Sequence, residues 1–166
     1  MSRYLTPLPK GLKFTDPVVV VATFGGSGLL RPAPGTWGSI AAVFAALPFA
    51  ILGGPVVLSI AAIAAFLIGL WATEKYNAAS GNHDPSEVVI DEVAAMWLVM
   101  AALPPNPIFY MLGFAFFRLF DIWKPWPIRG LEKRVAGEMG VMVDDLVAAI
   151  YAIMAAWIAG IAFFTA

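Results

Sequence analysis

Three long stretches of the chain carry no charged side chain, and apolar residues dominate each of them. The stretches are residues 32–73, 93–117 and 146–166, with lengths of 42, 25 and 21 residues. A helix crosses the roughly 30 Å of hydrocarbon in a bilayer with about 20 mainly apolar residues. The last stretch therefore predicts one spanning helix. The first predicts two helices, separated by the Gly-Gly-Pro turn at residues 53–55.

The middle stretch contains Pro-Pro-Asn-Pro at residues 104–107, and a helix cannot continue through this segment. It predicts two shorter helices, at residues 90–103 and 108–121. Each would be about 21 Å long at a rise of about 1.5 Å per residue. That is short for a full span, so we expect a tilted or re-entrant hairpin. The pattern as a whole predicts an all-α, polytopic membrane fold with four to five hydrophobic helices.

Residues 1–36 differ from this apolar core. They hold a short apolar run, residues 18–21, and a loop rich in glycine and proline. The run is too short to span a bilayer, so we expect a short interfacial helix in a segment that lies on the membrane surface. Residues 37–166 then form the helical membrane core of one domain, 1–166. Alanine and glycine along the predicted helices permit close packing, either within one chain or in a homo-oligomer.

Composition agrees with a membrane protein and excludes several kinds of chemistry. Apolar residues make up 61% of the chain and charged residues only 13%, against about 25% charged in a typical soluble domain. The net charge of −1 leaves no broad basic field to bind nucleic acid. Because the chain has no cysteine, a disulfide, a thiolate nucleophile and a cysteine-ligated metal are all excluded. A single histidine excludes mechanisms that need two.

The distribution of the charges predicts one polar face. The positive-inside rule places the basic N-terminal region in the cytoplasm. Two predicted hairpins then return residues 74–92 and 121–145 to the same side, and the outer turns at 53–55 and 104–107 are uncharged. All charged side chains are thus assigned to the cytoplasmic face. A channel or transporter would need polar groups at mid-depth or on both faces.

The Gly/Pro loop that leads into the first long helix is a candidate phosphate site. Backbone N–H groups at a helix N-terminus bind anions, and three side chains could assist: Arg31, Thr36 and Ser39, with Ser27 as a further possible member. The loop is not a Walker motif, because no Gly-Lys-Ser/Thr follows. The alternative interpretation is that Thr36 or Ser39 only caps the helix.

Five carboxylates at the ends of the hydrophobic segments are candidate metal ligands. An unpaired carboxylate is costly at the edge of the membrane's hydrocarbon core, so the recurrence of acids at these positions indicates a bound cation. Hard oxygen ligands favour Mg²⁺, which can neutralise a phosphate and activate water. Helix-dipole stabilisation is the alternative for the acids that open helices. The candidate ligands are Asp91, Glu92, Asp121, Asp144 and Asp145, and the catalytic candidates among them are Asp91, Asp121 and Asp145.

Cations near Asp121 complete the predicted site. Arg118, Lys124 and Arg129 suit phosphate binding, although with the neighbouring tryptophans they could also serve only as a membrane anchor. His83 and Glu87 are further possible members. Glu87 shares a helical face with Asp91, four residues later.

At these positions the sequence resembles the phosphatidylglycerophosphatase A family. The shared motifs are Pro-Gly-Thr-x-Gly-Ser at 34–39, Asp-Glu-x-x-x-Met-Trp at 91–97, Arg-x-x-Asp-x-Trp-Lys-Pro-Trp-Pro-Ile-Arg at 118–129, and the glycines at 137 and 140 with the acids at 144–145. Together they spread over residues 24–150. The motif at 118–129 is long enough to make a chance match implausible.

The resemblance implies a bacterial inner-membrane phosphatase that depends on Mg²⁺. It would hydrolyse phosphatidylglycerol phosphate, a membrane lipid, to phosphatidylglycerol and phosphate. The residues leave open whether water or an aspartate attacks phosphorus. One alternative is a membrane phosphotransferase acting on CDP-linked lipids, but its Asp-Gly-x-x-Ala-Arg pattern is absent from the sequence. The other is a non-enzymatic transporter or assembly subunit.

Overall fold

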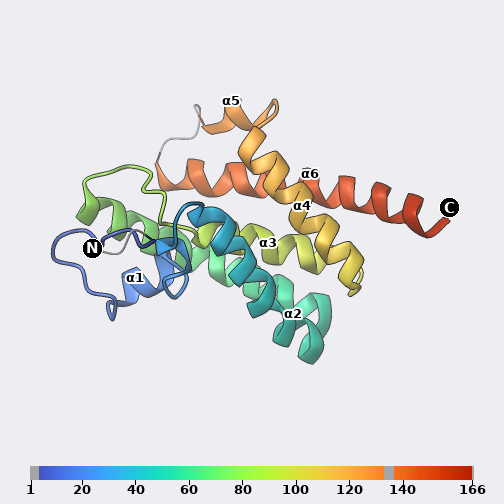
Figure 1. Cartoon of the computed structure of the whole chain (residues 1–166), viewed down its shortest axis with the longest axis horizontal. Coiled ribbons are helices and arrows are strands. Elements are labelled where there is room, and N and C mark those ends of the chain that lie inside the picture. Colours follow the sequence, from blue (N-terminus) through green and yellow to red (C-terminus); the bar gives the residue numbers. More distant parts are fainter. Residues whose placement is uncertain (1–3, 133–136, 166) are drawn as a thin grey trace.

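The computed structural model describes residues 4–132 and 137–165, and the helices within these ranges account for most of the chain. Figure 1 shows their arrangement, with the two ends of the chain at opposite ends of the molecule. The elements in chain order are α1 (Pro17–Ala22), the 3₁₀ turn η1 (Ser27–Leu29), α2 (Pro34–Ser80), α3 (Ile90–Ala102), α4 (Pro107–Trp123), α5 (Ile128–Glu132) and α6 (Glu138–Thr165).

Helix α2 consists of two halves joined at a sharp kink. Gly54 has φ 61° and ψ −156°, a conformation far from helical that glycine adopts without a Cβ penalty. Pro55 follows and suits the first turn of the second half. The chain reverses direction at this point (Figure 1). The predicted separation of two helices at residues 53–55 is therefore confirmed.

The two predicted middle helices are present as α3 and α4, and they meet at the proline-rich turn. Asn106 caps α4, because its side-chain oxygen accepts a hydrogen bond from the Ile108 N–H at 2.8 Å. The expected short helix in the N-terminal region is present as α1. An isolated β-bridge between Leu5 and Leu30 holds the N-terminal strand-like segment against the loop that precedes α2.

Small residues allow the long helices to pack closely. Alanines at 42, 62, 72, 149 and 156 are buried at helix contacts. A Cβ on Gly69 would press on Ile90 of α3 and on Met142 of α6. Two indole N–H groups also connect helices. Trp97 donates to the Ala42 carbonyl at 2.9 Å, and Trp157 donates to the Ala102 carbonyl at 3.1 Å.

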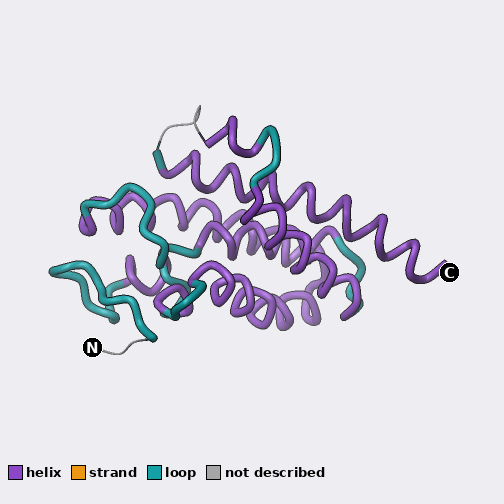
Figure 2. Tube along the Cα trace, turned by 45° about the horizontal axis from the view of Figure 1, so that its top comes forward, coloured by secondary structure: helices purple, strands orange, loops and turns teal. Residues whose placement is uncertain are grey.

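Two helices, α2 and α6, are long and apolar enough to cross a membrane. Much of their apolar surface faces outward: Ile51 and Leu52 near the kink are 81% and 85% exposed. Such a surface suits hydrocarbon rather than water. Figure 2 shows loops gathered around the N-terminal end of the molecule, while α6 runs out to the C-terminus at the other end. The predicted all-helical class is confirmed, and it is compatible with a membrane protein.

Candidate functional site

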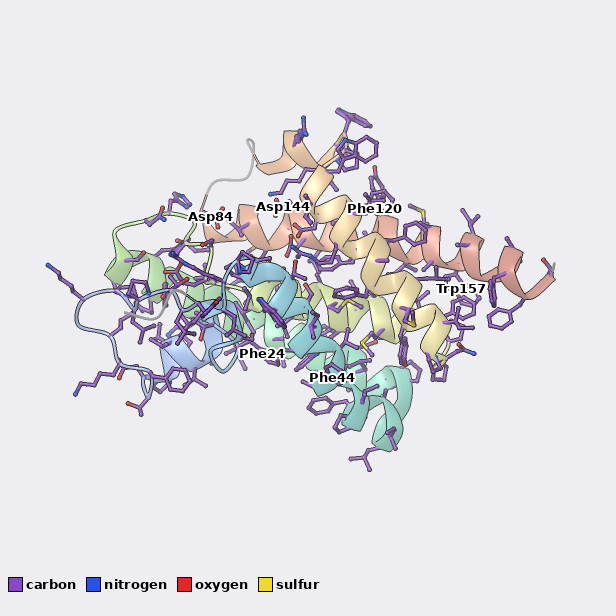
Figure 3. All side chains as sticks on the ribbon, viewed as in Figure 1. Phe24, Phe44, Asp84, Phe120, Asp144 and Trp157 are labelled. Carbon is purple, nitrogen blue, oxygen red and sulfur yellow. The ribbon has the colours of Figure 1, made fainter. Side chains whose placement is uncertain are left out.

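A polar cavity of about 390 Å³ lies where four helix ends converge. The N-terminal ends of α2, α3 and α6 meet the C-terminal end of α4, and the loop before α3 closes one side. Figure 3 shows Asp84 and Asp144 in this part of the molecule and Trp157 farther toward the C-terminus. The lining residues that carry polar side chains are Thr36, Asp84, Ser86, Asp91, Glu92, Arg118, Asp121, Lys124, Asp144 and Asp145.

Three carboxylates form the centre of the site. One carboxylate oxygen from each of Asp91, Glu92 and Asp145 lies within 4.8 Å of the other two. Asp91 and Asp145 are only 7% and 5% exposed. Three negative charges this close together and this far from water repel one another strongly unless a cation lies among them.

Arg118 forms ion pairs with two acids on one side of this centre. Its Nη1 lies 2.7 Å from Asp121 Oδ2 and 3.8 Å from Glu92 Oε1. The same nitrogen donates to Ser39 Oγ at 3.4 Å, and that hydroxyl donates to the Gly35 carbonyl at 2.8 Å. One guanidinium therefore connects α4 to the starts of α2 and α3. Its fork geometry allows several oxygen acceptors at once.

Lys124 supplies the second cation, from the end of α4. It pairs with Asp144 Oδ2 on α6 at 2.5 Å. Lys124 has φ 45° and ψ 65°, a left-handed conformation that costs a non-glycine residue roughly 1–2 kcal/mol. This backbone conformation ends α4 and turns the chain toward α5, while the ammonium group stays at the cavity.

Gly35 allows the start of α2 to approach the carboxylates. A Cβ at this position would overlap Glu92 Oε1 and would lie 3.2–3.3 Å from the two terminal nitrogens of Arg118. No residue with a side chain fits there without moving both partners. The glycine therefore lets the backbone at a helix N-terminus, a natural anion-binding position, border the charged cavity.

The donor set fits a hard divalent cation. Within residues 4–132 and 137–165, Glu92 Oε2 and Asp145 Oδ2 are buried side-chain oxygens without a hydrogen-bond partner. Buried polar atoms without a partner are costly, and these two belong to the close carboxylate trio. Carboxylate oxygens are the ligands that Mg²⁺ prefers. Asp91, Glu92 and Asp145 are thus the residues that could hold such an ion.

The structure brings most of the predicted site residues together. All five predicted carboxylates line the cavity, as do Thr36, Arg118 and Lys124. Ser39 is fully buried one turn farther along α2 and reaches the site through its contact with Arg118.

The other predicted site residues do not line the cavity, and each has a local partner. Arg31 is exposed and its Nε donates to Thr6 Oγ1 at 3.1 Å, whereas Ser27 Oγ donates to the Phe24 carbonyl at 3.0 Å. Arg129 is also exposed, and its Nη2 donates to a backbone carbonyl, that of Trp123, at 3.0 Å.

The two further candidates from the loop before α3 also lie outside the cavity lining. Glu87 Oε1 accepts a hydrogen bond from the Tyr76 hydroxyl at 3.2 Å. His83 is exposed, and its backbone carbonyl accepts from Asn77 Nδ2 at 2.7 Å.

Sequence reasoning did not single out three cavity residues: Gly35, Asp84 and Ser86. Asp84 and Ser86 flank Pro85, which is buried. The Val88 N–H donates a hydrogen bond to the Pro85 carbonyl at 3.0 Å and so closes the turn before α3. The available signal was their place in a short acidic segment just before Asp91. For Gly35, the signal was a glycine directly after a proline that starts a helix.

Apolar helices long enough to cross a membrane, with a carboxylate- and cation-lined cavity at their converging ends, are compatible with a membrane protein that has one polar end. Comparison with known families then identifies the chain. Residues 20–160 match the family described as Phosphatidylglycerophosphatase A. The chain belongs to this family.

Individual relatives agree with this assignment. A phosphatidylglycerophosphatase A of Haemophilus influenzae is 39% identical over 150 residues, which cover 89% of this chain and 91% of the relative. One of Escherichia coli is 37% identical over 156 residues, 90% and 87% of the two chains. A Bacteroides thetaiotaomicron protein provisionally named phosphatidylinositol-3-phosphatase is 36% identical over 153 residues, 86% and 95% of the two chains. No solved structure matches the chain significantly.

Proposed function

We propose that this protein hydrolyses phosphatidylglycerol phosphate to phosphatidylglycerol and phosphate. Membership of the family and the names of two relatives support this substrate. The observation that carries the proposal is the cavity itself, in which the Asp91, Glu92 and Asp145 trio faces Arg118 and Lys124. Carboxylates with adjacent cations suit the hydrolysis of a phosphate monoester, because cations stabilise the negative charge on the phosphate oxygens in the transition state.

We also propose that Asp91, Glu92 and Asp145 hold Mg²⁺, with Asp121 and Asp144 nearby. When bound, the ion supplies Lewis-acid stabilisation of the phosphate and lowers the pKa of water. Two orphaned carboxylate oxygens in the described part of the chain, Glu92 Oε2 and Asp145 Oδ2, support this assignment.

The remaining groups of the cavity bind and orient the phosphate. Arg118 and Lys124 are each held by an acid, Asp121 and Asp144 respectively, and both cations border the cavity in which the phosphate oxygens would bind. Thr36 adds a hydroxyl and the first backbone N–H groups of α2 border the cavity. Water attacks phosphorus and a cavity carboxylate takes its proton. The bond between phosphorus and the glycerol oxygen breaks, and the protonated carboxyl group passes that proton to the leaving oxygen.

The proposed membrane arrangement rests on the distribution of charged side chains, which the sequence assigns to one face of the membrane. We propose a multi-pass protein of the bacterial inner membrane, in which the halves of α2 (34–53 and 55–80), α3, α4 and α6 form five hydrophobic segments and the cavity opens to the cytoplasm. The chain has no cysteine, so single-cysteine variants report sidedness directly. In intact spheroplasts, a membrane-impermeant maleimide should label Pro105→Cys and leave Ser86→Cys unlabelled; the reverse pattern contradicts this orientation.

A comparison of substrates tests the activity. Purified protein with Mg²⁺ is assayed for phosphate release from phosphatidylglycerol phosphate, phosphatidic acid and phosphatidylinositol 3-phosphate, each at equal mole fraction in one detergent. We expect the highest kcat/KM for phosphatidylglycerol phosphate. A preference for phosphatidylinositol 3-phosphate would contradict the proposed substrate, and no release from any of the three would contradict the proposed activity.

Replacing Gly35 by alanine should damage the site without removing any functional group. The new Cβ displaces the Glu92 carboxylate and crowds Arg118, and misplacement of catalytic groups by about 1 Å can cost about 100-fold in rate. We expect a fall of about this size in kcat for phosphate release. Gly130→Ala is the matched control, because its Cβ meets nothing within 4 Å. Equal activity of the two variants would contradict the close approach at Gly35.

A further inference from the structure

A second, apolar groove of about 380 Å³ lies between the first half of α2 and α4. The polar cavity described above lies at the ends of the same two helices. Ile40, Val43 and Leu47 line the groove from α2, and Met111 and Phe114 line it from α4. Nothing in the proposed hydrolysis uses this groove.

The groove continues the cavity along one face of each helix. On α2 the cavity residue Thr36 is followed by Ile40, Val43 and Leu47, at spacings of four, three and four residues. Residues at these spacings share one helical face. The groove on this side therefore begins one helical turn from the cavity.

The α4 side shows the same continuity. From the cavity residue Arg118, the groove residues Phe114, Met111 and Pro107 follow at spacings of four, three and four. The polar cavity and the apolar groove are thus consecutive parts of one channel-like surface between α2 and α4. Polar groups for a phosphate lie at one end, and the rest is lined by apolar side chains and by Tyr110.

The groove covers most of the depth of one leaflet of a bilayer. It runs from Ile40 to Leu47 on α2 and from Pro107 to Phe114 on α4, seven residue steps on each helix, which corresponds to about 10 Å of helix. The hydrocarbon core of a bilayer is about 30 Å thick, so each leaflet contributes about 15 Å. Phe44 and Met111, at the open side of the groove, are 68% and 70% exposed and would contact lipid directly.

We propose that this groove binds one acyl chain of the phospholipid whose phosphate occupies the cavity. The inference rests on the proposed function and extends it: the enzyme recognises a lipid by its chain as well as by its phosphate. Chain binding along α2 and α4 fixes the depth and direction of the headgroup. The terminal phosphate then reaches Arg118 and the carboxylates, whereas a water-soluble phosphate monoester lacks this guidance.

Filling the groove tests the proposal by activity. Val43→Trp and Met111→Trp each place a large side chain in it, and Leu67→Trp is the control at an exposed apolar position of α2 that lines neither the groove nor the cavity. For long-chain phosphatidylglycerol phosphate we expect at least a tenfold lower kcat/KM in both groove variants, mainly through KM, and none in the control. Activity on the deacylated headgroup, glycerophosphoglycerol phosphate, should be unchanged. Groove variants that match the control, or that lose activity equally on both substrates, overturn the proposal.

A second measurement does not depend on turnover. Phosphatidylglycerol phosphate with a diazirine at the end of one acyl chain is photolysed with the wild-type protein, and the labelled peptides are identified by mass spectrometry. We expect labelling concentrated in residues 40–47 and 107–114 that excess unlabelled substrate prevents. Labelling spread over the apolar surface without competition overturns the groove. If the wild type releases no phosphate from any lipid, the proposed function fails, and this labelling still decides the groove.

Discussion

Replacing Asp145 by asparagine is expected to lower kcat/KM for phosphatidylglycerol phosphate at least about 100-fold while the protein stays folded. Loss of an outer-shell partner of a metal ligand already costs about 10–100-fold, and Asp145 belongs to the central trio itself. Asp91→Asn should behave alike.

The same substitution should not destabilise the metal-free protein. Asp145 is 5% exposed and close to two other carboxylates, so removing its charge relieves repulsion among buried acids. In the presence of EDTA we expect a Tm equal to or above that of the wild type. Glu74→Gln is the control, an exposed acid whose only ion pair in the described part of the chain is with Lys75. Full activity of Asp145→Asn would remove the trio from the mechanism.

Arg118→Ala should cause the second large loss, and here stability should fall as well. The guanidinium contacts Asp121, Glu92 and Ser39. Removing it leaves two largely buried acids without their cation, and breaking such a pair costs roughly 3–5 kcal/mol. We expect a fall in kcat/KM of at least about 100-fold, together with a lower Tm in detergent.

Two further variants separate these effects for Arg118. Arg118→Lys keeps the positive charge without the planar fork, so it should restore most of the Tm and only part of the activity. Lys75→Ala removes an exposed cation elsewhere and should leave both unchanged. If Arg118→Lys were fully active, the fork would have no role in binding phosphate and a point charge would suffice.

The helices could be predicted from the sequence because their signals are local. Charge-free runs, the Gly-Gly-Pro turn at 53–55 and the prolines at 104–107 mark the hydrophobic segments, and the kink at Gly54 lies within the predicted turn. Two of these helices, α2 and α6, are supported as membrane spans by length and composition. The number of segments that cross depends on the bilayer, and chain pattern alone does not determine it.

The acidic residues of the site could be predicted from the sequence, but the basic residues that line it could not. Acids at helix ends were assigned to the same side of the membrane and were therefore expected to lie close together, and the five predicted carboxylates do line one cavity. Charge alone did not separate Arg118 from Arg31 and Arg129. Those two arginines donate to nearby groups, Thr6 and the Trp123 carbonyl, which only the folded chain reveals.

Product formation by the purified wild-type protein on phosphatidylglycerol phosphate is measured with Mg²⁺ and with EDTA. We expect equal amounts of phosphatidylglycerol and phosphate with Mg²⁺, at least about a 100-fold slower reaction with EDTA, and recovery when Mg²⁺ is restored. A rate that EDTA leaves unchanged would contradict the metal role of Asp91, Glu92 and Asp145, and the absence of both products would contradict the proposed function.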